Sequence, residues 1–176
     1  VEALARMAAM AAVDGNAREH ERLSREVIAQ AESRGIPADT PASVFPARAR
    51  FELIEPRFEE YSAIQFKGAL RVQGRLLQEK ARLLAELEAE YQKVLPWKAL
   101  EWTTAAYFRL AQIHELFARS LFEAEIPEMS EEEMDIYQTA IEDKARVYQE
   151  TAQQRYETLR VRGLPRGAEP CARFRL

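Results

Sequence analysis

Cysteine and histidine are scarce in this chain, which limits the chemistry it can support. Cys171 is the only cysteine, and His20 and His114 are the only histidines. One cysteine cannot form an internal disulfide, and a conventional zinc site needs several clustered His and Cys ligands. A di-iron site in a helical bundle needs Glu-x-x-His on two helices, but Ala17 and Ala111 stand three residues before the histidines. The sequence therefore predicts no metal and no cofactor.

Glycine and long apolar runs are also rare. None of the six glycines belongs to a GxGxxG or GxxxxGKS/T phosphate-binding motif. The chain has no uninterrupted run of about 18 apolar residues, so no transmembrane segment is expected. The segment VEALARMAAMAAV begins with Val1 and carries Glu2 and Arg6, which makes it amphipathic rather than a signal core. We expect a trimmed or excised part of a longer bacterial protein, and both the periplasm or cell envelope and the cytoplasm stay open as compartments.

Charge is unevenly distributed around a formal net charge of −4. Acidic residues without any basic neighbour fill one segment: Glu123, Glu125, Glu128, Glu131, Glu132, Glu133, Asp135, Glu142 and Asp143. The C-terminal tail is basic instead, with Arg160, Arg162, Arg166, Arg173 and Arg175 against Glu169. The acidic segment repels phosphate and the tail has one aromatic residue, Phe174, so nucleic acid is not an expected partner. A solvated acidic face and a frayed terminus are the simpler interpretation.

What the chain has in abundance is helix-forming residues. Hydrophobic residues make up 47% and charged residues 31%, with many Ala, Leu, Glu, Arg and Gln. We predict an all-α protein with helices over residues 1–13, 17–34, 42–66, 75–95, 98–124 and 131–161. Pro46 and Pro56 predict one or two kinks or breaks in the third helix, because each removes a backbone donor.

Local signals define several helix ends. Asn16 is placed to cap the second helix, and Gly35 to end it in a left-handed conformation. Ser130 and Glu133 have the spacing of a capping box at the start of the sixth helix. Gly163 followed by Pro165 predicts where that helix ends.

The fourth helix carries a partial heptad pattern. Apolar residues recur at intervals of seven in two series, Leu77, Leu84, Tyr91 and Lys80, Leu87, Val94, with a lysine in the second. The pattern lasts under three heptads, and further leucines widen the apolar stripe. A globular packing helix is favoured over a coiled-coil seam.

The helix over residues 102–122 carries the most informative pattern. Tyr107, Leu110, Ala111 and His114 share one face, and this face needs neighbouring helices to bury it. Ala152, Tyr156, Leu159 and Pro165 follow at a matching spacing in the next helix.

Together, these two helices resemble a tetratricopeptide repeat, with His114 where an aromatic residue is usual and Leu159 where a small residue is usual. The segment over residues 105–163 also resembles the C-terminal part of tetratricopeptide-repeat proteins of myxobacterial cell envelopes, including those linked to gliding motility. The resemblance implies stacked antiparallel helical hairpins in an α-solenoid with long, irregular helices. Its expected extent is one domain over residues 1–164 followed by an Arg-rich tail over residues 165–176.

The resemblance implies a non-enzymatic protein–protein interaction scaffold, whose partner is a peptide or helix of another subunit. If the Tyr107 face packs inward, Phe108, Gln112 and Glu115 lie on flanking faces and are candidates for the binding groove. Trp97 and Trp102 are candidates for an aromatic platform. For all five residues, packing against neighbouring helices is the alternative.

Two other classes of function stay open. Exposed apolar ends of a solenoid could drive self-assembly without another partner, and we expect a monomer or a weak homo-oligomer. An enzyme with an unfamiliar site is the less favoured class. Carboxylates four residues apart, Glu55 with Glu59 and Glu86 with Glu90, share helix faces but do not differ in sequence from solvated surface charges.

Overall fold

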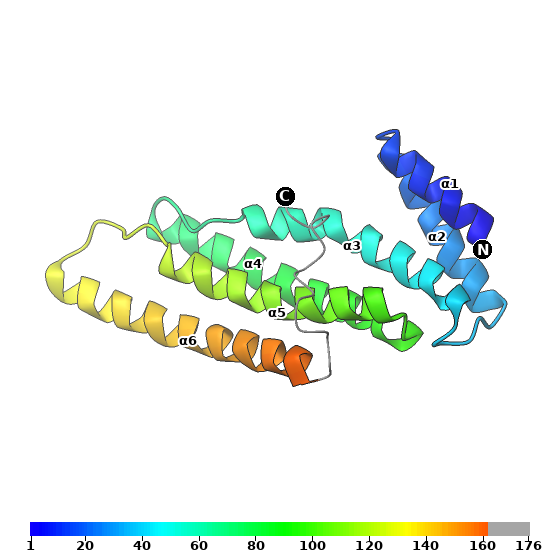
Figure 1. The fold of residues 1–176 in the computed structure, drawn as a ribbon. Coiled ribbons are helices and arrows are strands. Elements are labelled where there is room, and N and C mark those ends of the chain that lie inside the picture. The colour runs from blue at the N-terminus through cyan, green and yellow to red at the C-terminus, as the bar shows by residue number, and fades with distance from the viewer. Residues whose placement is uncertain (162–176) are drawn as a thin grey trace. The chain divides into compact units, whose positions relative to one another are not determined.

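The structure is a computed structural model that describes residues 1–161. Within that range 82% of the residues are helical and no strand is present, so the prediction of an all-α protein is confirmed (Figure 1). The α-helices are α1 (Glu2–Val13), α2 (Ala17–Ser33), α3 (Val44–Ala63), α4 (Leu70–Gln92), α5 (Leu100–Phe122) and α6 (Glu131–Val161). Two short 3-10 helices, η1 (Pro41–Ser43) and η2 (Leu95–Trp97), precede α3 and α5. The predicted tail over 165–176, with Gly163, Pro165 and Cys171, lies outside the described residues.

Three predicted helix ends are present in the structure. The Asn16 side-chain oxygen accepts a hydrogen bond from the Glu19 backbone N–H at 3.2 Å, so Asn16 caps α2. Gly35 has a φ of +59°, the left-handed conformation that ends a helix without a Cβ clash. At the start of α6, the Glu133 N–H donates to Ser130 Oγ at 3.3 Å and the Ser130 N–H donates to Glu133 Oε2 at 3.0 Å. This reciprocal pair is the predicted capping box.

The third helix was predicted to carry one or two kinks or breaks. The structure places a 3-10 turn at Pro41–Ser43 and then one helix that continues through Pro46 and Pro56 to Ala63, so a break at either proline is wrong. Pro46 lies in the first turn of α3, where a backbone N–H has no acceptor within the helix. Pro56 lies in the interior, between the buried residues Ile54 and Phe58. Burial on both sides of Pro56 stabilises the helix despite the missing hydrogen bond.

The chain divides into two compact units. Unit 1 comprises Val1–Pro56 and Ala89–Ala106, and unit 2 comprises Arg57–Glu88 and Tyr107–Leu176, of which the structure describes residues up to 161. The boundaries fall inside α3, α4 and α5, so each of these three helices contributes residues to both units.

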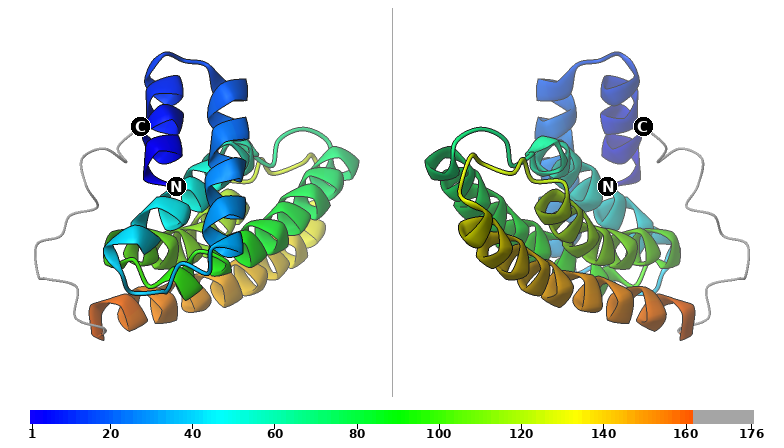
Figure 2. Two further views of the ribbon diagram at one scale, coloured as in Figure 1. Left: turned by 90° about the vertical axis from the view of Figure 1, so that its right-hand side faces the viewer. Right: turned by 90° about the vertical axis from the view of Figure 1, so that its left-hand side faces the viewer.

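Unit 1 contains the hairpin of α1 and α2 (Figure 2). Small residues form its core, where Ala8 and Ala11 of α1 pack with Leu23 of α2. A second cluster joins Val27 and Ile28 of α2 to α3. Elsewhere in unit 1, Phe51, Tyr91 and Trp102 form an aromatic cluster in which Phe51 lies 5.5 Å, between ring centroids, from each of the other two.

Unit 2 contains helix segments from α3, α4 and α5 together with α6, which runs alongside α5 (Figure 1). Its core consists of large side chains with almost no exposed surface: Tyr61, Leu83, Leu87, Ile113, Phe117 and Leu121. The apolar and aromatic residues of α6 that are buried or half-buried recur every three or four residues, at Met134, Tyr137, Ile141, Ala145, Tyr148, Ala152, Tyr156 and Leu159, with Thr151 and Arg155 half-buried beside them. This spacing gives α6 a narrow packing stripe, as in helical bundles.

Candidate functional site

The face of α5 identified from sequence is largely buried in unit 2. Leu110 is 4% exposed, Ala111 is fully buried and His114 is 7% exposed, whereas Tyr107 is half-buried. These positions lie where the helical spacing predicts an inward face. They are packing residues of the unit 2 core.

The three groove candidates on α5 are engaged within unit 2. The Phe108 ring lies 5.7 Å from the Tyr156 ring of α6. Glu115 accepts a hydrogen bond from the Tyr156 hydroxyl at 2.6 Å, and Gln112 accepts one from Arg109 at 2.6 Å. Burial, together with the Glu115 carboxylate, raises the pKa of Tyr156, so its hydroxyl stays protonated and donates to Glu115. The structure thus places Phe108 and Glu115 in the contact of α5 with α6, which is the packing alternative.

The two tryptophans belong to unit 1. Trp102 is 8% exposed and packs on the Phe51 ring. The Arg48 guanidinium lies 5.9 Å from the centre of the Trp102 ring. Trp97 is half-buried in η2, and its backbone carbonyl accepts the Asp39 N–H at 3.0 Å. Trp102 is therefore a packing anchor, and little of its ring surface is open to a ligand.

His20 is partly buried in unit 1. Its side chain is 16% exposed, and its Nε2 atom lies 3.2 Å from Glu52 Oε2 and 3.4 Å from the hydroxyl of Ser24. A catalytic triad needs the serine and the carboxylate on different ring nitrogens, but here both approach Nε2. Ser24 is also fully buried. The cluster links α2 to α3 and is structural.

A buried amine in unit 2 was not identified from sequence as a feature of its own. Lys80 is fully buried and donates hydrogen bonds to the Ile64 carbonyl at 2.8 Å and to Ser120 Oγ at 2.7 Å. Burial lowers the pKa of Lys80 to about 8, with Glu123 opposing the shift. Its amine stands 4.7 Å from the centre of the Tyr61 ring. The signal in the sequence was a lysine on the otherwise apolar stripe of α4.

The contact of Lys80 with Ser120 has the distance of a serine–lysine dyad but serves another purpose. The Ser120 hydroxyl donates to the Leu116 carbonyl at 2.8 Å. The Lys80 amine donates a hydrogen bond to the carbonyl of Ile64, the residue just after the end of α3. An activated serine needs its hydroxyl proton directed at the base. The geometry is that of a lysine binding the exposed carbonyls at a helix C-terminus.

Gln73 joins two loops of unit 2. Its Nε2 donates to the Gly68 carbonyl at 2.8 Å and to the Glu125 carbonyl at 2.7 Å, and its Oε1 accepts from the Tyr137 hydroxyl at 3.0 Å. The Glu125 N–H in turn donates to the Phe66 carbonyl at 2.9 Å. Gln73 thereby holds the loop after α3, the loop after α5 and α6 together.

The carboxylate pairs considered for catalysis are largely occupied. Glu86 forms ion pairs with Arg57 and Arg82, each at 2.6 Å, and Glu90 pairs with Lys93 at 2.5 Å. Glu55 accepts a hydrogen bond from Tyr91 at 2.7 Å. Over residues 1–161, no group of three or more His, Cys, Asp and Glu side chains is arranged to hold a metal ion.

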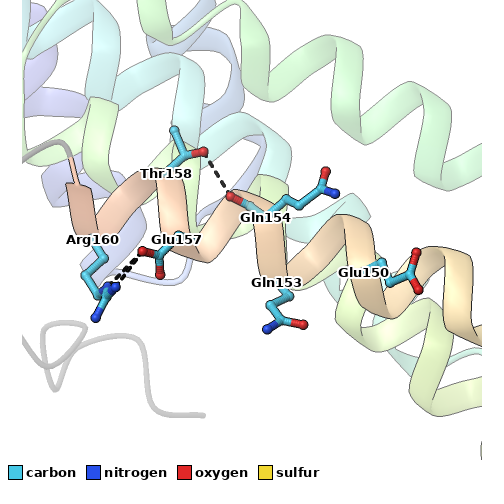
Figure 3. A pocket seen from close by; sticks show the side chains of 6 residues that line it. All are labelled: Glu150, Gln153, Gln154, Glu157, Thr158 and Arg160. Atoms are coloured by element: carbon cyan, nitrogen blue, oxygen red, sulfur yellow. Dashed lines mark hydrogen bonds and ion pairs between the residues drawn. The ribbon is translucent and has the colours of Figure 1, made fainter.

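A depression on α6 gathers polar side chains without forming a convergent site (Figure 3). Glu157 is paired with Arg160 at 2.6 Å, and the Thr158 hydroxyl donates to the Gln154 carbonyl at 2.9 Å. All the lining side chains come from this one helix: Glu150, Gln153, Gln154, Glu157, Thr158 and Arg160. In Figure 3 the Gln153 side chain points away from those of Gln154 and Glu150, so the six side chains do not converge on a common ligand.

The outer face of α1 is the clearest uncovered apolar surface of unit 1. Met7 is 51% exposed, Met10 65% and Val13 87%. The only charged residues of this twelve-residue helix, Glu2 and Arg6, pair with each other at 2.6 Å. A helix that is apolar around most of its circumference is normally buried. We name Met7, Met10 and Val13 the α1 face.

Over residues 1–161 the fold defines an all-helical protein with two compact units. No helix within residues 1–161 has both the length and the apolarity needed to cross a bilayer. Comparisons with models of known protein families, with curated proteins and with solved structures find no match.

Proposed function

We propose that this chain is a non-enzymatic protein–protein interaction scaffold that binds a partner helix through the α1 face. The exposure of Met7, Met10 and Val13 carries the proposal. Large exposed apolar side chains gathered on one helix are typical of interaction surfaces. Methionine suits this role because its flexible thioether adapts to the shape of a partner.

The chemistry of the α1 face favours an apolar helix as the ligand. The two charged groups on α1 neutralise each other, so the helix offers no net charge to select an acidic or basic peptide. Twelve residues of helix extend about 18 Å, which matches roughly three turns of a partner helix lying alongside. Recognition would come from side-chain packing rather than from ion pairs.

The resemblance to tetratricopeptide repeats supports the same proposal. In a solenoid, each helical hairpin covers the apolar face of its neighbour, and the hairpin of α1 and α2 has such a face uncovered. A place in a cell-envelope multiprotein complex, in a stacked helical array of the tetratricopeptide type, is the setting we propose for it.

The experiment compares binding by matched variants. Met7→Glu with Met10→Glu places two charges on the α1 face, and Val147→Glu places one on α6, where Val147 is 61% exposed. We expect a partner captured from extracts of the source organism by the wild-type chain to be lost with the α1 variant and retained with Val147→Glu. Equal capture by all three proteins would contradict the proposal.

Self-assembly is the alternative that the same surface allows. Light scattering over a range of protein concentrations distinguishes the two. A mass that doubles with concentration in the wild type, and stays monomeric in the Met7→Glu, Met10→Glu variant, would show that the α1 face binds a second copy. A concentration-independent monomer, together with loss of a distinct partner, supports the scaffold.

A further inference from the structure

His114 lies where α6 packs on α5 in unit 2. The side chain is 9% exposed, and its ring stacks on Tyr148 of α6 with centroids 6.1 Å apart and an interplanar angle of 28°. Tyr148 stacks in turn on Phe117 at 4.1 Å. The imidazole is therefore part of the packing that holds the C-terminal half of α6.

The polar surroundings of His114 are incomplete. Neither ring nitrogen has a hydrogen-bond partner among the described residues. Its Nε2 atom lies 3.9 Å from Glu88 Oε1 of α4, which is within ion-pair range and beyond hydrogen-bond length. The same Glu88 oxygen accepts a hydrogen bond from Arg155 of α6. A protonated His114 would have to share this carboxylate with a guanidinium.

The charges around the ring favour its neutral form. Burial lowers the pKa of His114, the Arg155 charge lowers it further, and Glu88 opposes both. On α3, Tyr61 donates its hydroxyl to the Ile113 carbonyl at 2.5 Å, and burial raises the pKa of Tyr61, so this group adds no charge near neutral pH. The remaining titratable neighbour, Tyr148 of α6, contacts the ring through its aromatic face.

We propose that His114 is an acid-sensitive latch for α6: as a neutral ring it lets α6 pack on α4 and α5, and its protonation in mild acid releases the C-terminal half of α6. A buried imidazolium would lie beside Arg155 without a carboxylate of its own, whereas in the released state water solvates it. Release exposes the packing stripe of α6, including Tyr148, Ala152 and Leu159. The latch is independent of the proposed binding by α1.

The direction of the pH effect follows from proton linkage. A solvated histidine titrates near pH 6.5, and the packed His114 holds its proton less tightly. The fraction of molecules in the packed state is therefore highest above about pH 6.5 and decreases as the pH falls below this value. One histidine changes the ratio of packed to released molecules by at most about tenfold per pH unit.

Hydrogen exchange of α6 measures the latch directly. In the intact chain we expect protection of the amides over residues 145–159, corrected for intrinsic exchange, to fall by up to about tenfold from pH 7.5 to pH 5.5. The variant His114→Phe keeps an aromatic ring for stacking on Tyr148 and removes the titration, so its protection should be independent of pH. The control His20→Gln removes the only other histidine, in unit 1, and should behave like the wild type.

A nuclear magnetic resonance titration of the His114 ring in the wild type provides a readout that does not require a variant to fold. A midpoint below 6.5, coupled to the change in α6 protection, supports the latch. A midpoint at or above 6.5 would overturn it. The same conclusion would follow if His114→Phe lost α6 protection with the pH dependence of the wild type.

Discussion

The hairpin of α1 and α2 in unit 1 and the core of unit 2 use different kinds of residue to hold their helices. In unit 1, the hairpin of α1 and α2 packs on the small side chains Ala8 and Ala11 with Leu23, and the opposite side of α1 exposes Met7 and Met10. In unit 2, the core contains large aromatic residues and buried polar groups. The hairpin thus leaves apolar side chains exposed where a partner could bind them, whereas the packing stripe of α6 is buried within unit 2.

Buried polar groups sharpen the contrast. Lys80 and Gln73 of unit 2 make specific hydrogen bonds to backbone carbonyls, and these bonds fix the loops beside α6. A buried polar group is costly unless it is paired, so such contacts favour one arrangement of the helices over others. Unit 2 is expected to be rigid for this reason. The hairpin core of Ala8, Ala11 and Leu23 has no such device.

Phe117→Ala should give the largest effect. Phe117 is fully buried between Phe66 and Tyr148, with ring centroids 6.3 and 4.1 Å away, so its removal leaves a cavity. We expect the free energy of unfolding measured by denaturant titration to fall by about 3 to 5 kcal/mol. The matched variant Phe122→Ala, on the same helix but 55% exposed, should change it by less than about 1 kcal/mol. Similar losses for both would contradict the assignment of the unit 2 core.

Substitution of Lys80 should lower the free energy of unfolding by less than Phe117→Ala does, and this loss should depend on pH. Lys80→Ala leaves the Ile64 carbonyl and Ser120 without their donor and should cost about 2 to 3 kcal/mol, whereas Lys80→Met retains volume and should be milder.

The Lys80 pKa of about 8 in the folded state is below its unfolded value, so the unfolded state binds more protons between about pH 8 and 10.4. Stability of the wild type relative to Lys80→Met should therefore rise with pH across that window. Denaturation of both proteins at pH 7.5 and 9.5 checks this. A stability difference that stays constant would mean that folding leaves the Lys80 pKa unchanged, and one that falls would mean that folding raises it, so either result would contradict the account.

Asn16→Ala tests the less tightly specified hairpin of unit 1. The Asn16 side chain satisfies one backbone donor at the start of α2, so its loss should reduce the protection of the first turns of α2 by about 1 kcal/mol in hydrogen exchange. Asn16→Ser, which retains an oxygen acceptor, is the control and should cost much less. An equal loss in both variants would mean that the cap does not stabilise α2.

The features predictable from sequence are those that depend on nearby residues. The cap at Asn16, the left-handed Gly35 and the box of Ser130 with Glu133 each involve groups within a few positions, and all three were predicted. At Pro56 the sequence left a kink and a break both open, because the continuity of α3 there depends on the burial of Ile54 and Phe58, which lie on either side of the proline.

The contacts at the candidate site that could not be predicted from the sequence join residues far apart in the chain. The ring of Phe108 meets Tyr156 across 48 positions, and the amine of Lys80 meets Ser120 across 40. Helical periodicity identifies a buried face and says nothing about which helix covers it. For the same reason the sequence offered Phe108 and Glu115 as groove candidates with helix packing as the alternative, and the structure shows that α6 contacts both.

The central claim is that the α1 face is a binding surface, and site-specific photo-cross-linking in cells tests it most directly. A photoreactive residue at position 10, replacing Met10, should form an adduct with one distinct protein, and the same residue at position 147, replacing Val147 of α6, should not. No adduct at position 10, or the same adducts from both positions, would contradict the account.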